Sequence, residues 1–191
     1  MPSCLDCLPG PVAVRTTLGL FVAGLVGCAA TAPVPLVPSD VPAAIRAPQG
    51  QPLFLEALAT GVQIYECVAR GEAAAGYGWV FRAPESALTD RAGRPLGTHY
   101  AGPTWESVDG SKVSATVVAS DPGSTPSAIP WLLLTVKMTS GAGVLTQTKS
   151  IQRLQTVGGV APAKPCSADT ANQTVRVPYT ATYRFYRPAP T

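Results

Sequence analysis

Glycine and proline interrupt this chain too often for long helices to form. The sequence holds 18 glycines and 20 prolines among its 191 residues, and both residue types disfavour the interior of a helix. Between them lie short segments rich in β-branched and aromatic residues, which are typical of strands. The pattern therefore favours an all-β, mainly antiparallel domain, either a single sandwich or a partly closed barrel with long Gly- and Pro-containing loops.

Several segments carry specific strand signals. Asp109-Gly110 is the kind of dipeptide that turns a hairpin, and the residues on either side of it alternate between apolar and polar. In the last segment, alternate residues from Tyr179 to Phe185 are aromatic or apolar and share one face. A short helical turn is expected at residues 53–59, and a loop or single turn at 84–90. Strands are expected at residues 62–68, 78–82, 104–108, 113–117, 130–138, 144–155 and 175–187.

Composition and charge limit the class of protein. Hydrophobic residues make up 46% of the chain and charged residues 13%, so the chain can bury a core. Its length suits one domain better than two. The net charge is +3, and no run of lysine and arginine occurs. A nucleic-acid partner is therefore not indicated.

The N-terminal region predicts export. Residues 16–27 read TTLGLFVAGLVG after Arg15, an apolar run too short to span a membrane, which takes about 20 residues, but long enough for a secretory signal. The run ends in Leu25-Val26-Gly27-Cys28, which resembles the lipobox of bacterial lipoproteins. That resemblance implies cleavage before Cys28 and diacylation of its thiol. The alternative is an ordinary signal peptide followed by a chance cysteine.

The expected organisation follows from this signal. We expect a lipoprotein signal peptide at residues 1–27, a Pro-rich tether at 28–52, one β-rich domain at 53–188 and a short tail at 189–191. The location would be the bacterial cell envelope, facing the periplasm or the exterior. The membrane would be a partner through the lipid anchor.

Cysteine counting predicts one disulfide. Cys4 and Cys7 would leave with the signal peptide, and Cys28 would carry lipid, which leaves Cys67 and Cys166. A disulfide between them is the natural state in an oxidising compartment, and two buried free thiols are the alternative. His99 is the only histidine, whereas a structural zinc site takes four ligands from cysteine and histidine. The sequence thus indicates neither a metal site nor a cofactor.

The surroundings of His99 form the main candidate site. Tyr100, Trp105, Glu106 and Asp109 are close to it in sequence, and a histidine beside a carboxylate can act as a general base near neutral pH. Glycines and a proline nearby predict an irregular loop, where binding residues often lie. The alternative is a structural histidine that braces the hairpin through hydrogen bonds.

Two looser groupings are also conceivable. One is an aromatic platform for a glycan or apolar ligand, and the other is an arginine cluster for an anion, although core packing and a solvated strand face explain these residues as well. No G-x-S-x-G nucleophile motif occurs. The platform would comprise Trp79, Tyr100, Trp105 and Trp131, and the cluster Arg153, Arg184 and Arg187.

Many of these segments, in this order, resemble a family of exported proteins known only as a domain of unknown function, DUF3455. The resemblance covers about residues 52–188 and implies a secreted location, with Cys67 and Cys166 both inside the domain and no established activity. It rests on the segments GVQIYEC (61–67), WVFRAPE (79–85), GTHYAGPTWE (97–106), DGSKV (109–113), IPWLLL (129–134), IQRLQTVGGVAP (151–162) and YTATYRFY (179–186).

The sequence therefore favours an envelope lipoprotein whose β domain binds a small or polymeric ligand, or a partner. The first alternative is an enzyme that uses His99 with Glu106 or Asp109 as acid and base. The second is a purely structural component of the envelope.

Overall fold

Eight strands build the domain in the computed structural model of this protein, which describes residues 41–71 and 76–189. In these residues, helical structure is limited to the short 3₁₀ turns η1 (Ala43–Ile45), η3 (Val144–Gln147) and η4 (Ala168–Thr170). The strands are β1 (Leu53–Ala69), β2 (Tyr77–Thr89), β3 (Pro95–Tyr100), β4 (Thr104–Ser107), β5 (Lys112–Asp121), β6 (Trp131–Ser140), β7 (Ser150–Gly158) and β8 (Thr174–Tyr186).

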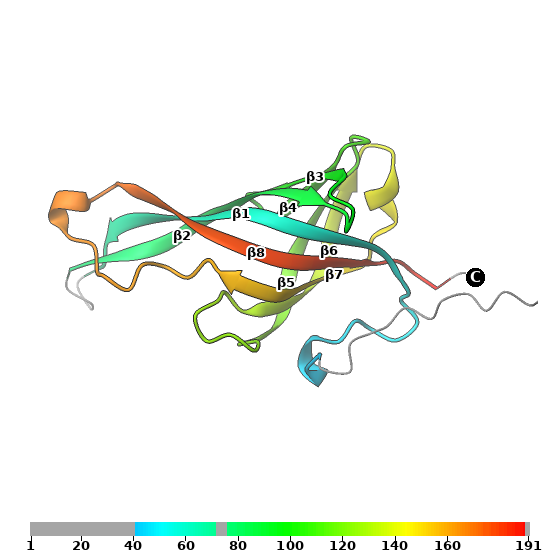
Figure 1. The fold of residues 1–191 in the computed structure, drawn as a ribbon, viewed down its shortest axis with the longest axis horizontal. Coiled ribbons are helices and arrows are strands. Elements are labelled where there is room, and N and C mark those ends of the chain that lie inside the picture. Colours follow the sequence, from blue (N-terminus) through cyan, green and yellow to red (C-terminus); the bar gives the residue numbers. More distant parts are fainter. Residues whose placement is uncertain (1–40, 72–75, 190–191) are drawn as a thin grey trace, which may run out of the picture. The chain divides into compact units, whose positions relative to one another are not determined.

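The strands form a single closed sheet (Figure 1). Each strand pairs antiparallel with the next one along the chain, and β8 also pairs with β1, which closes the sheet. The predicted all-β, antiparallel class is confirmed. Pairing is incomplete along some strands: β2 pairs with β3 only at Ser86–Thr89, and β5 pairs with β4 only at Lys112–Ser114.

The strands differ greatly in length, and this difference shapes the interior. β1 has 17 residues and β2 and β8 have 13 each, whereas β3 has 6 and β4 only 4. The long strands therefore run together past the ends of β3 and β4 (Figure 1). The closed sheet therefore extends less far along the strand direction at β3 and β4 than at β1, β2 and β8.

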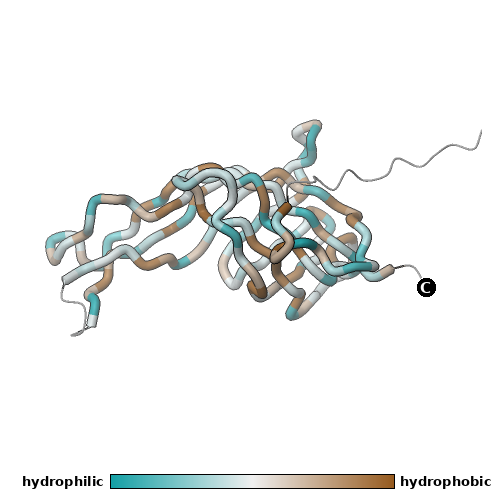
Figure 2. The backbone as a smooth tube through the Cα atoms, turned by 90° about the horizontal axis from the view of Figure 1, so that it is seen from below, coloured by the Kyte–Doolittle hydropathy of each residue, from teal (hydrophilic) through white to brown (hydrophobic). Residues whose placement is uncertain are grey.

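Hydrophobic and hydrophilic residues follow one another closely along the chain (Figure 2), and alternation along a strand places successive side chains on opposite faces of the sheet. The main core lies inside and holds Trp105, Ile151, Tyr183 and Phe185, all with at most 1% of their surface exposed. The predicted shared face of Tyr179, Ala181, Tyr183 and Phe185 is confirmed as part of this core.

A second apolar cluster lies apart from the main core. The segment just before β1 carries Val41 and Ile45, which pack against Trp131, Leu133 and Leu154. The Gln152 side-chain amide donates to the carbonyl of Ile45, which ties this segment to β7 (2.5 Å). Residues 41–52 fall in the expected tether, and at least their first part is in contact with the domain.

Two local predictions were wrong on the long strands, and residues 144–147, expected to begin a strand, form η3 instead, with β7 starting only at Ser150. Residues 53–59 belong to β1 and not to a helical turn, because Ala57 and Ala59 alternate into the core while the backbone pairs with β8. Residues 84–89 belong to β2 and pair with β1, and Ser86–Thr89 also pair with β3. Pairing between distant segments overrode local preference in both cases.

The hairpin prediction was right. β4 and β5 pair around the Asp109-Gly110 turn, with Trp105 opposite Val113. The apolar segment that follows forms β6, as expected. Among the described residues, no helix has the length and apolar character needed to cross a membrane.

Candidate functional site

A cavity of about 440 Å³ lies inside the closed sheet. All eight strands contribute to its lining, and so do the turn between β3 and β4 and the residues just before β6. Phe81 and Val117 line it while 47% and 46% of their surfaces are exposed, so they mark its mouth. Its volume falls within the range of about 300–1,000 Å³ that is usual for small-molecule sites.

The β3–β4 hairpin places His99 and Trp105 in the cavity wall. The two residues are paired directly across the hairpin, and their rings stack with centroids 4.3 Å apart and planes 13° apart. Tyr183 from β8 meets both rings edge-on, at 5.0 and 5.3 Å. Tyr183 lies far from this hairpin in the sequence, so closure of the sheet brings the three rings together.

His99 lies on a regular strand and not on the irregular loop predicted for it. Its neighbour Gly97 is required for another reason: a Cβ atom there would collide with the carbonyl oxygen of Glu106 on β4. Glycine thus allows β3 and β4 to approach closely. The hairpin turn itself is confined to residues 101–103.

The histidine is neutral at physiological pH. Only 3% of its surface is exposed, and burial lowers the pKa of His99 from 6.5 to about 4, against the raising effect of its bond to Thr104. Nδ1 lies 2.8 Å from the Thr104 carbonyl oxygen, which can only accept, so Nδ1 donates. The other ring nitrogen, Nε2, is therefore an acceptor.

Three polar side chains in the lining are buried without a partner. Within the described part of the chain, the only buried side-chain nitrogen or oxygen atoms that lack a hydrogen-bond partner are Gln63 Nε2, Trp105 Nε1 and the Tyr183 hydroxyl. All three residues line this one cavity. Buried polar groups in native proteins are nearly always paired, so each exception calls for an explanation.

Two arginines also line the cavity, and they differ in their pairing. Arg82 forms an ion pair with Glu66 at 2.7 Å. Arg153 donates from Nε and Nη2 to the carbonyl of Pro130, at 3.1 and 2.9 Å, and no carboxylate of residues 41–71 or 76–189 lies within ion-pair distance of it. Its charge acts on the cavity, because it contributes to lowering the pKa of His99.

The structure does not bring the predicted carboxylates to His99. Glu106 accepts a hydrogen bond from the Tyr100 hydroxyl at 2.9 Å and pairs with Lys112 at 3.1 Å. Because side chains alternate along β3 and β4, Tyr100 and Glu106 point away from the face that carries His99 and Trp105. The Tyr100 hydrogen bond, followed by that of Lys112, lowers the pKa of Glu106.

Asp109 organises two turns. Its carboxylate accepts from the backbone and hydroxyl of Ser111, at 2.9 and 2.6 Å, and from the backbone N–H of Val144 at 2.7 Å. These bonds lower the pKa of Asp109 to about 2, with the Ser111 hydroxyl as the largest cause. The contacts tie the β4–β5 turn to η3.

The residues of the predicted aromatic platform do not lie together in the structure, and neither do those of the predicted arginine cluster. Trp79 donates to the carbonyl of Lys164 at 3.1 Å, and Trp131 packs in the cluster with Ile45. Arg184 is buried against Glu56 at 2.9 Å, whereas Arg187 is exposed beside Gln147. Of these residues, Trp105 and Arg153 line the cavity.

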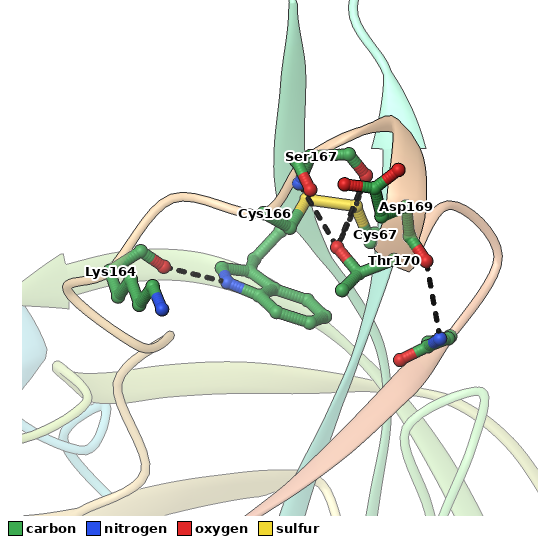
Figure 3. Close-up of a disulfide and its surroundings, with 8 residues drawn as sticks. Cys67, Lys164, Cys166, Ser167, Asp169 and Thr170 are labelled. Carbon is green, nitrogen blue, oxygen red and sulfur yellow. Dashed lines mark hydrogen bonds between the residues drawn. A yellow bond between two sulfur atoms is a disulfide. The ribbon is translucent and has the colours of Figure 1, made fainter.

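The predicted disulfide between Cys67 and Cys166 is confirmed (Figure 3). Their Cα atoms are 5.9 Å apart, and the bond joins the end of β1 to the loop before η4. The Thr170 hydroxyl lies 3.6 Å from Cys67 Sγ. The same loop region reaches the cavity wall, because the Tyr65 hydroxyl donates to the carbonyl of Gly159 at 2.7 Å.

A metal centre is not formed by the described residues. Nowhere in residues 41–71 and 76–189 do three or more histidine, cysteine, aspartate or glutamate side chains gather closely enough to hold a metal ion. The predicted lipid anchor at Cys28 lies outside the described residues.

Sequence reasoning missed Gln63 and Tyr183 as site residues. Gln63 carried a usable signal: it occupies an inward position of β1, between Gly61 and Tyr65, where an apolar residue is expected. Tyr183 was assigned to the shared core face, and nothing in the sequence shows that its hydroxyl lacks a partner.

A family described as a protein of unknown function (DUF3455) matches residues 48–187 of the chain, a span that contains all eight strands. No curated protein and no solved structure was found to match it.

Proposed function

The chain belongs to the DUF3455 family, whose description assigns no activity, and we propose that its domain binds a small, largely apolar molecule in the cavity of the closed sheet. In this proposal the protein is an exported lipoprotein, held at the bacterial envelope through Cys28. The domain then captures its ligand close to the membrane surface.

One observation carries the binding proposal. The three buried polar atoms without a partner all belong to side chains that line the same cavity. A purely structural domain gains nothing from such groups, because each costs about 1–3 kcal/mol when left unpaired. A ligand that enters the cavity would pair them.

The composition of the wall supports an apolar ligand. Side chains such as Val117, Ile129, Leu132 and Leu134 supply most of the surface, and a few polar groups converge among them. Ligand sites in proteins commonly have this make-up. The exposed rings and methyl groups at the mouth, on Phe81 and Val117, give an apolar ligand a favourable entrance.

The export proposal rests on the sequence. The apolar segment before Cys28 and the lipobox-like Leu25-Val26-Gly27-Cys28 motif support it. The disulfide is consistent with folding in an oxidising compartment.

A fluorescent probe tests the binding proposal. N-phenylnaphthylamine, which is neutral and brightens in apolar surroundings, is titrated into the full chain carrying Cys28→Ala, so that neither lipid nor detergent competes. We expect saturable binding with one site per chain. Val117→Trp, which fills the mouth, should weaken binding about tenfold or more, a loss of about 1.4 kcal/mol.

Val118→Trp is the matched control. Val118 is the next residue on β5, is 56% exposed and does not line the cavity. It should bind the probe as the parent does. Equal loss in both variants, equal binding in both, or a signal that never saturates would reject the cavity as a binding site.

A further inference from the structure

We infer that the cavity selects an apolar molecule that carries one carboxylate, with Arg153 as its ionic partner and Gln63, Trp105 and Tyr183 as hydrogen-bond donors. This inference rests on the proposed function and narrows it to a chemical class. It follows from the kinds of polar atom that the cavity offers, from its charge and from its apolar wall.

The unpaired atoms are donors. An indole N–H and a side-chain amide NH₂ can only donate, and a tyrosine hydroxyl can donate as well as accept. Trp105 Nε1 and Gln63 Nε2 therefore call for an acceptor on the ligand, and the Tyr183 hydroxyl is able to donate to the same acceptor. A carboxylate has two oxygens with about four acceptor positions and no donor, so it suits such a set.

The charge of the cavity is positive and is set by one group. No aspartate or glutamate of residues 41–71 and 76–189 contributes to the lining. Arg82 is neutralised by Glu66, and His99 is uncharged because burial lowers its pKa to about 4. Arg153 is thus the one lining cation of the described chain without a carboxylate partner.

A single guanidinium matches a single carboxylate. Arginine and carboxylate form short, charge-assisted hydrogen bonds, often two in parallel. A phosphate monoester carries up to two charges at neutral pH, and burying the second one without a cation is costly. A cationic ligand would meet Arg153 with no acidic group nearby to offset it.

The rest of the cavity requires an apolar body. Ile129, Leu132 and Leu134 present hydrocarbon to the interior, and the stacked rings of His99 and Trp105 form a flat aromatic wall. The hydrocarbon part of the lining favours a ring or a short chain over a sugar, whose hydroxyl groups would lose water against it.

Three matched probes test this inference by calorimetry on the full chain with Cys28→Ala, at about pH 7.5, where a carboxylic acid is ionised. The probes are naphthaleneacetate, its neutral amide and naphthylmethylamine, which is cationic. We expect naphthaleneacetate to bind about tenfold or more tightly than the amide, as a charge-assisted bond allows. The amine should bind more weakly than the amide.

Arg153→Met identifies the ionic partner, because methionine keeps much of the arginine's apolar stem and removes its charge. The variant should bind naphthaleneacetate no better than the amide, while its affinity for the amide stays within about twofold of the parent. Arg187→Met is the control, since Arg187 is exposed and does not line the cavity. It should leave both affinities unchanged.

The outcomes separate the inference from the proposed function. If the acid and the amide bind equally, or if Arg153→Met lowers both affinities alike, the carboxylate inference fails while the cavity remains a binding site. Preference for the amine would also overturn it. If none of the probes binds, and N-phenylnaphthylamine does not bind either, the proposed function itself fails.

Discussion

At the scale of a single residue, the unpaired amide of Gln63 in the cavity wall lowers the free energy of unfolding. The side chain is 2% exposed, and its Nε2 atom has no partner. Gln63→Leu replaces it with an apolar group of similar shape, so we expect the free energy of unfolding to rise by about 1–2 kcal/mol. Urea unfolding measures this change. A loss of stability would show that the amide serves the fold and not a ligand.

His99 should make the fold sensitive to mild acid. The pKa of His99 is 6.5 in an unfolded chain and about 4 in the folded one, so the unfolded state binds the proton more tightly. The contribution of neutral His99 to the free energy of unfolding is therefore fully present above about pH 6.5. It is lost as the pH drops toward 4, by about 3 kcal/mol in total. Thermal melts between these two pH values measure the fall.

Four carboxylates have lowered pKa values, so the stability that they contribute is lost in a lower pH range than that of His99. The pKa values of Asp109, Glu85, Asp90 and Glu106 are all lowered from ordinary values of 4.5 or less. The stability that they contribute is lost only below those values. His99→Phe keeps a ring against Trp105 and should flatten the melting profile between pH 6.5 and 4.5, whatever its stability at neutral pH. An unchanged slope would contradict the account.

At the scale of elements, the disulfide holds the extension of the long strands. Cys67 lies at the end of β1, where β1 and β2 run beyond β3 and β4. Replacing Cys67 and Cys166 together with alanine should cost about 4–5 kcal/mol, because the bond closes a loop of about 100 residues. Hydrogen exchange should rise most at residues 65–69 and 77–81. Faster exchange confined to β3 and β4 would contradict this placement.

Elements were predictable from the sequence where their signals are local. The β4–β5 hairpin follows from Asp109-Gly110, and β6 follows from an unbroken apolar run. The first half of β1 was not predictable, because Leu, Glu and Ala favour helix locally while pairing with β8 imposes a strand. Its partner lies more than a hundred residues away in the sequence.

The candidate site was predictable only in part, for a related reason. His99 and Trp105 were found because they lie on one hairpin. Gln63, Arg153 and Tyr183 come from β1, β7 and β8, and only closure of the sheet brings them to the same cavity. Whether a buried polar atom has a partner depends on packing in three dimensions.

At the scale of the whole molecule, the proposed function joins a binding domain to a lipid anchor. Cys28→Ala should move the protein from the membrane fraction to the soluble exported fraction, because the acyl chains supply the apolar contact with the bilayer. Fractionation and intact mass of the parent and the variant measure this. A parent protein that is already soluble and has no added lipid mass would contradict the anchor.

The most direct test of ligand binding follows the indole N–H signals of the three tryptophans in a ¹⁵N–¹H spectrum during titration with naphthaleneacetate. Trp105 Nε1 is buried in the cavity wall without a partner, whereas Trp79 Nε1 already donates to the carbonyl of Lys164. We predict a saturable shift of the Trp105 signal as its N–H gains an acceptor, with the Trp79 and Trp131 signals unmoved. A Trp105 signal that stays in place while the ligand saturates the protein would contradict the account.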